Sequence, residues 1–212
     1  FAFMNSEKLS RDEKQLKTRL ALIESGFSLI SSHGYGAVSI RNISKHANYT
    51  QGAFYSNFSN KEDFLLELMR LQFEKENLQL QTIISKEDLK SDYSIEKLRV
   101  WLSDFFNNFE WLKISIELQL YASRDKSFAL EYQKVWQTHK DEVAKILIYL
   151  IPAAQPVDQN QIETITAELI SLSYGLALQY MIFKDDVEKF VDIIFSLEIF
   201  VFFKLLQVIF DV

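Results

Sequence analysis

The chain has 212 residues, of which 48% are hydrophobic, and it carries a formal net charge of −6 with five glycines, two prolines and no cysteine. So few glycines and prolines exclude a β-sandwich or barrel, whose many tight turns consume both residues, and favour long helices. The missing cysteines exclude a disulfide scaffold, a zinc–thiolate site and cysteine catalysis, while the hydrophobic content excludes an intrinsically disordered chain.

The first predicted helix spans about residues 11–33. The spacing Ser10-x-x-Glu13 is that of a capping box, and apolar residues then recur at alternating spacings of four and three through Ile30. Gly34 is suited to end this helix, because glycine readily adopts the left-handed conformation found after helix C-termini.

Two short helices are expected next, over residues 39–46 and 51–58, with Ser39 and Thr50 as their N-caps. The turn between them requires a residue with positive φ, and Asn48 tolerates that conformation better than most non-glycine residues. Two short helices joined by about three residues are typical of a helix-turn-helix.

Charge is distributed unevenly along the chain. The stretch Ser25–Lys61 contains Arg41, Lys45 and Lys61 but no aspartate or glutamate, although the whole chain is acidic. An acid-free surface in an acidic protein favours a polyanionic partner. A chance distribution of charge within a partly buried segment is the alternative.

Long helices are predicted for the remainder. Ser59-x-x-Glu62 is a second possible capping box, opening a helix that extends to about residue 84. Further helices are expected at 94–109, 111–123, 127–151, 158–183 and 187–211. The predicted fold class is all-α with about nine helices: an N-terminal three-helix helix-turn-helix domain (residues 1–60) and a C-terminal helical domain for ligand binding and dimerisation (residues 61–212).

The run from Tyr35 to Glu62 resembles the DNA-binding signature of the TetR/AcrR family of transcriptional regulators. Three positions depart from the family pattern: Asn48 replaces the glycine of the turn, Tyr49 replaces a small apolar residue, and Asn57 replaces an aromatic residue. The resemblance implies a homodimer that binds a near-palindromic double-stranded DNA operator. The residues in register with the signature are Gly52, Phe54, Tyr55, Phe58, Lys61 and Glu62.

The expected DNA-binding residues lie on the two short helices and at the start of the next. Gln51 can pair bidentately with adenine, Ala53 can contact a thymine methyl group, and Gly52 permits close backbone approach. The resemblance implies phosphate contacts for Tyr55, Asn57 and Lys61, with a purely structural hydroxyl as the alternative for Tyr55. The full expected set is Ser39, Arg41, Thr50, Gln51, Gly52, Ala53, Tyr55, Asn57 and Lys61.

The end of the chain has the composition of a partner-covered helix. Residues 190–210 include 16 apolar residues of 21, but Asp192, Glu198 and Lys204 interrupt them, which argues against a membrane span. A helix that is apolar on most faces is covered on most sides, so we expect an isologous dimer interface built from this helix and the preceding one. The expected interface residues are Ser171, Gly175, Phe200 and Phe203.

Aromatic residues are concentrated between residues 64 and 180. They can line a pocket for a small apolar or aromatic effector, with ordinary core packing as the alternative. The expected pocket residues are Trp101, Phe105, Tyr121, Trp136 and Tyr174.

Motifs for enzymatic chemistry are missing from the sequence. It contains no P-loop, dinucleotide fingerprint or nucleophile elbow, and no histidine stands at metal-ligand spacing, so we expect no catalysis, cofactor or metal. The predicted function is a cytoplasmic, ligand-responsive DNA-binding regulator, expected to be a repressor. The alternative is an all-helical dimeric interaction or small-molecule carrier protein without DNA binding.

Overall fold

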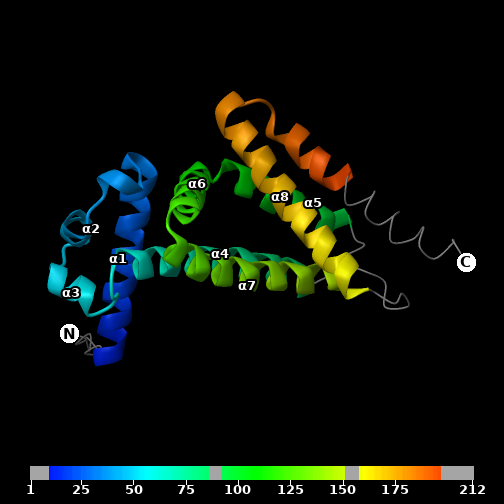
Figure 1. Cartoon of the computed structure of the whole chain (residues 1–212). Coiled ribbons are helices and arrows are strands. Elements are labelled where there is room, and N and C mark those ends of the chain that lie inside the picture. Colours follow the sequence, from blue (N-terminus) through cyan, green and yellow to red (C-terminus); the bar gives the residue numbers. More distant parts are fainter. Residues whose placement is uncertain (1–9, 86–91, 151–157, 197–212) are drawn as a thin grey trace, which may run out of the picture.

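The computed structural model describes residues 10–85, 92–150 and 158–196, and in these ranges the ordered elements are all helical. The all-α prediction is therefore confirmed, with eight bounded α-helices and a ninth helical segment over residues 187–196 (Figure 1). In chain order the elements are α1 (Arg11–His33), the 3-10 helix η1 (Tyr35–Ala37), α2 (Ile40–His46), α3 (Gln51–Tyr55), α4 (Lys61–Ser85), α5 (Asp92–Asn107), α6 (Phe109–Arg124), α7 (Lys126–Leu150) and α8 (Gln159–Phe183).

The boundaries of α1 and of the turn after α2 follow the local chemistry that the sequence predicts. Ser10 and Glu13 form the expected capping box, and Gly34 ends the helix at φ 79° with its N–H donating to the Ile30 carbonyl. Asn48 has φ 59°, so the turn between α2 and α3 uses the residue expected to adopt the left-handed conformation.

Two predicted boundaries around α3 and α4 are wrong. Helix α3 ends at Tyr55 rather than at residue 58, because the chain turns at residues 56 and 57 and brings Phe58 into the core beside Phe54. Helix α4 is capped one residue later than predicted, since Asn60 Oδ1 accepts from the Asp63 N–H at 2.7 Å. The shifted cap leaves the Glu62 side chain free for a contact with another helix.

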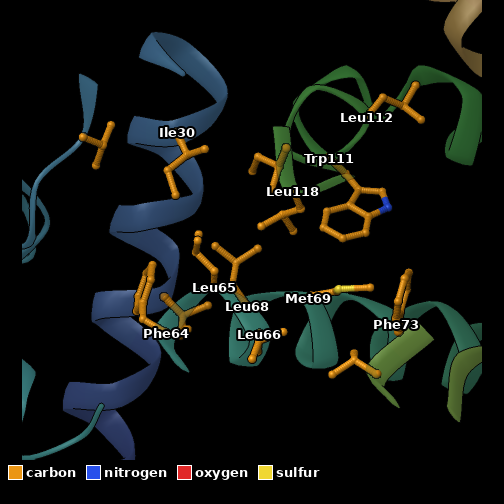
Figure 2. Close-up of a cluster of buried hydrophobic side chains, with 14 of the residues drawn as sticks. Ile30, Phe64, Leu65, Leu66, Leu68, Met69, Phe73, Trp111, Leu112 and Leu118 are labelled. Atoms are coloured by element: carbon orange, nitrogen blue, oxygen red, sulfur yellow. The ribbon is translucent and has the colours of Figure 1, made fainter. Parts of the chain in front are cut away.

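Helix α4 runs through the centre of the core. Its apolar side chains pack between α1 and α6, where Trp111, Leu112 and Leu118 contribute from the α6 side (Figure 2). Burying each such side chain stabilises the fold by roughly 1.5–3 kcal/mol. The buried apolar residues of the first half of α4 are Phe64, Leu65, Leu66, Leu68, Met69 and Phe73.

The first turns of α4 also belong to the core beneath α1 and α3. The Phe64 ring lies 5.4 Å from that of Phe54 and 5.1 Å from that of Phe58, centroid to centroid. A Cβ atom on Gly26 would lie 2.2 Å from Phe64 Cζ, so only glycine lets α1 cross α4 this closely. The expected division between residues 60 and 61 therefore cuts through a shared core.

The helices form two regions along α4. We call α1, η1, α2 and α3 the head, and α4 to α8 with the segment 187–196 the body (Figure 1). In the body α4 packs against α7 and α5, and α8 packs on α5, α6 and α7. Within the described residues α8 is the one helix long and apolar enough to cross a membrane by length and composition alone.

Candidate nucleic-acid interface and cavities

The recognition helix α3 presents its first turn to solvent. Thr50, Gln51 and Gly52 are exposed, Ala53 is half-buried, and Tyr55 is 56% exposed. Such an exposed N-terminal turn can insert into a DNA major groove, where an amide side chain reads base edges. The fold itself does not need a glycine at position 52, because a Cβ there would meet only Thr50 Oγ1, at an ordinary 3.6 Å.

Hydroxyl caps hold the two short helices in place. Thr50 Oγ1 accepts from the Ala53 N–H at 3.1 Å, and its own O–H is left free to donate outward. Ser39 Oγ accepts from the Asn42 N–H at 3.1 Å, and its O–H donates to the Asn42 side chain. Ser39 is therefore exposed as predicted, but its hydroxyl is already used within α2. Arg41, on the same helix, is exposed.

Asn57 and Lys61, two of the predicted phosphate contacts, also have hydrogen-bond partners inside the head. Asn57 Nδ2 donates to the Ala53 carbonyl at 2.8 Å. Lys61 Nζ donates to the carbonyls of Tyr35, at 2.8 Å, and Val38, and lies 3.8 Å from the centroid of the Tyr35 ring. Burial lowers the pKa of this ammonium. Both side chains stabilise the head, and their contacts with phosphate remain a prediction.

The acids nearest to the acid-free stretch are bound to other groups. Glu62 accepts from the Tyr121 hydroxyl at 3.0 Å, and Asp63 accepts from the Ser59 N–H at 3.0 Å. Glu67 pairs with Arg19 at 2.8 Å. The exposed cations Arg41 and Lys45 form no ion pair with a described residue, which favours attraction of an anion.

The body contains two cavities, which share Ile170 and Tyr174 as walls. The inner cavity, of about 110 Å³, lies among α4, α5, α7, α8 and the segment 187–196. The outer cavity, of about 490 Å³, lies among α6, α7 and α8. Among the predicted pocket residues, Trp101 and Phe105 line the inner cavity, Trp136 lines the outer one, and Tyr174 lines both.

The prediction for Tyr121 is wrong, because this residue lines neither cavity. Its ring packs against Tyr35 of η1, at 4.8 Å between centroids, and its hydroxyl donates to Glu62 of α4. At the other end of the same helix, Trp111 Nε1 donates to the Tyr174 hydroxyl at 3.2 Å. Helix α6 thus contacts a cavity wall at one end and the head at the other.

Two polar side chains in the inner cavity were not anticipated from the sequence. Glu76 and His139 are 7% and 6% exposed and both line the cavity. Burial raises the pKa of Glu76 to about 7 and lowers the pKa of His139 to about 4, in each case by disfavouring the charged form. A sequence signal existed, since each stands among buried apolar positions at helical spacing: Phe73 and Leu80 around Glu76, and Val135 and Val143 around His139.

The outer face of α8 carries the predicted interface residues that the structure describes. Ser171 and Gly175 are exposed, and with Leu178 and Ile182 they recur at spacings of four, three and four along one side of the helix. A Cβ on Gly175 would meet no atom within 4 Å. All four residues are exposed, and three of them, Ser171, Gly175 and Leu178, also line the outer cavity between α8 and helices α6 and α7. Phe200 and Phe203 lie outside the described residues.

A short helix pair with an exposed recognition helix, mounted on a long-helix body with cavities, defines the class of helix-turn-helix regulators. The family model of the bacterial regulatory proteins of the tetR family matches residues 22–68. The HTH-type transcriptional regulator YwcC of Bacillus subtilis is 35% identical over 85 residues, which are 40% of this chain and 36% of YwcC. The chain thus spans about a third of the length of that relative.

Two further comparisons cover most of the chain. The HTH-type transcriptional repressor AcnR of Corynebacterium glutamicum is 21% identical over 155 residues, 72% of each chain. The crystal structure of a putative TetR-family regulator from Mesorhizobium loti covers 94% of this chain and 98% of its own with a TM-score of 0.68 at 14% identity, which shows the shared fold. Residues 22–68 therefore carry the helix-turn-helix of the bacterial regulatory proteins of the tetR family, and the chain as a whole shares the fold of a TetR-family regulator.

Proposed function

We propose that the protein is a cytoplasmic, ligand-responsive repressor that binds a near-palindromic operator as a homodimer. A small, apolar or aromatic effector held in the body releases it from DNA. Residues 1–60 supply the DNA-binding unit and residues 61–212 the effector-binding and dimerisation unit. The observation that carries this proposal is the exposed first turn of α3. This turn is capped by Thr50 and lies in the acid-free stretch Ser25–Lys61.

Sequence readout is assigned to α3 and phosphate binding to the residues around it. Gln51 has an exposed amide suited to a bidentate pair with adenine, and Ala53 is placed next to it for a thymine methyl. Arg41, Thr50 and Tyr55 have exposed donors that can reach phosphates. We propose that Ser39 and Gly52 contact the DNA as well. Asn57 and Lys61 are assigned to holding the head together.

Dimerisation is assigned to the stripe Ser171, Gly175, Leu178 and Ile182. The small residues at its N-terminal end allow a second copy of α8 to approach closely, and the apolar residues that follow them supply buried area. Two heads related by a two-fold axis are needed to read two half-sites about one DNA turn apart.

Effector release is assigned to α4 and α6. An effector in the cavities would displace Tyr174, which is hydrogen-bonded to Trp111 of α6. The far end of α6 contacts Tyr35 of the head and Glu62 at the start of α4. The effector acts only through its differential affinity for the two head arrangements, so a 100-fold preference corresponds to about 2.7 kcal/mol.

Selection of bound duplexes from genomic fragments, followed by gel-shift titration, tests the DNA-binding proposal. The Gln51→Ala variant is expected to lose about 1–3 kcal/mol of discrimination at one base pair of each half-site while retaining non-specific binding. The same change at the exposed Gln79 of α4, Gln79→Ala, is the matched control and retains full discrimination. If Gln51→Ala and Gln79→Ala bind every sequence as the wild type does, α3 does not read the operator. A wild-type chain that binds no duplex favours the carrier alternative.

A further inference from the structure

The inner cavity is an apolar and aromatic chamber with a small polar end. Trp101 and Phe105 form one wall, with ring centroids 6.1 Å apart and planes 16° from parallel. Glu76 and His139 lie on another wall, contributed by α4 and α7. Among the described residues that line the cavity, none carries a lysine or arginine side chain.

Glu76 has incomplete hydrogen bonding inside this chamber. One carboxyl oxygen accepts from Gln72 Nε2 at 2.8 Å, and in the described part of the chain the other oxygen has no hydrogen-bond partner. Its neighbour Lys75 is exposed to solvent. A buried carboxyl group without a paired cation is costly unless a ligand supplies the missing charge or donor.

His139, which also lines this cavity, has a second unpaired polar atom. Its ring stacks on Phe73 with centroids 3.8 Å apart, which fixes the ring plane, and Nδ1 is buried without a hydrogen-bond partner among the described residues. Because burial lowers the pKa of this ring to about 4, the imidazole is neutral near pH 7. A neutral imidazole can accept a hydrogen bond through its unprotonated nitrogen.

We propose that the inner cavity binds a small lipophilic cation: an amine whose ammonium group lies against Glu76 and His139 and whose apolar body lies against Trp101 and Phe105. This inference rests on the proposed effector function and names the chemical class of that effector. An ammonium group supplies the charge and donors that both side chains lack, and aromatic faces attract cations. An anionic ligand would find no basic partner there, and a purely apolar one would leave both polar groups unpaired.

The size of the cavity sets the size of the first probe. At about 110 Å³ it is somewhat smaller than a cavity of about 150 Å³ that holds benzene, so the first probe should carry no more than one ring and a short chain that bears the charge. Longer amines would have to displace Tyr174, which separates the inner cavity from the outer one.

Titration calorimetry with the full chain tests the inference with three probes of similar shape: 2-phenylethylammonium, uncharged propylbenzene and anionic 3-phenylpropanoate. We expect the ammonium to bind at least tenfold more tightly than either of the others. Glu76→Gln, which preserves shape but removes the charge, should weaken ammonium binding at least tenfold. Glu74→Gln, an identical change at an exposed position of α4, should leave it unchanged.

The outcomes separate this inference from the proposed function. Equal binding of the ammonium and propylbenzene, no ammonium binding, or equal affinity in Glu76→Gln and wild type would each overturn the cation site. Operator affinity measured with and without the ammonium tests the effector role by itself. If the ammonium binds through Glu76 but operator affinity stays unchanged, the cation site is confirmed and its role in releasing the protein from DNA is contradicted.

Discussion

Glu76 and His139 are buried in the lining of one cavity, where each is costly in its charged form. Burial raises the pKa of Glu76 from 4.5 to about 7 and lowers the pKa of His139 from 6.5 to about 4. For Glu76, the unfolded chain releases a proton above pH 4.5 that the folded chain retains to about pH 7. Glu76 therefore lowers the free energy of unfolding as pH rises through this window. For His139 the free energy of unfolding falls as pH decreases from 6.5 to 4.

Glu76→Gln is predicted to stabilise the protein at pH 8 relative to wild type, by up to about 3 kcal/mol, because the buried charge is removed. The difference in the free energy of unfolding should disappear at pH 4, where Glu76 is protonated in both the folded and the unfolded wild type. Urea unfolding of both proteins between pH 4 and pH 8 measures this difference, with Glu74→Gln as a control that follows the wild type. A pH-independent difference between Glu76→Gln and wild type would contradict the assignment.

Single residues were predictable where local chemistry determines their role. Asn48 was predicted from the backbone requirement of the turn, and the exposure of Gln51 follows from its place after the Thr50 cap. The partners of Lys61 were not predictable, because they are carbonyls more than 20 residues away in the chain. The contact of Tyr121 with the head likewise depends on where α6 packs, which local sequence does not determine.

At the scale of elements, Arg19 of α1 ties together the end of α3 and the beginning of α4. Its guanidinium donates to the Asn57 carbonyl at 2.6 Å, pairs with Glu67 at 2.8 Å and lies 4.4 Å from the centroid of the Phe58 ring. A planar guanidinium can make these three contacts at once, whereas an ammonium cannot. This residue holds the recognition helix in position although it lies far from it in sequence.

Arg19→Lys is predicted to loosen the anchoring of α3. Losing one charge-assisted hydrogen bond costs about 1.5–3 kcal/mol in a protected setting, and the partly exposed position reduces this to about 1 kcal/mol. Hydrogen exchange of the α3 amides should quicken accordingly. Arg11→Lys, on the exposed first turn of the same helix, is the control and should leave exchange unchanged. Equal protection of α3 in both variants would show that Arg19 does not anchor it.

Element boundaries were predicted well where a cap and a periodic apolar stripe coincide, as in α1. They failed by one residue at α4, because Ser59 and Asn60 both have capping side chains and tertiary packing selected Asn60. Helix α3 was predicted too long because Phe58 fits a helical spacing from Phe54 although the chain has already turned. Helix propensity alone does not decide which of two neighbouring capping residues is used or where a short helix ends.

At the scale of the whole molecule, α8 has both a packed and an uncovered side. Ile162, Thr166, Ile170 and Ala177 are buried, whereas Leu178 is 40% and Ile182 65% exposed. Helical periodicity predicted the helix, and the small residues predicted which side would be uncovered. Four of the five predicted pocket residues line the cavities, but their division between two cavities could not be predicted, because it arises from how six separate segments meet around Tyr174.

Ile182→Glu is predicted to raise the dimer dissociation constant at least tenfold, because it places a charge in the proposed apolar interface. Leu78→Glu, which introduces the same charge at a position of α4 that is also 65% exposed, should leave the dimer intact. Sedimentation velocity over a concentration series measures both. If Ile182→Glu and Leu78→Glu behave alike, the stripe on α8 is not where two protomers meet.

The most direct measurement is equilibrium binding of the purified wild-type chain to its selected near-palindromic duplex, by fluorescence anisotropy over a range of salt concentrations. We predict two protomers per duplex, much tighter binding than to a random duplex, and an affinity that falls with salt by a logarithmic slope of about −0.9 for each phosphate contacted. Equal affinity for selected and random duplexes at every salt concentration would contradict operator recognition by this protein.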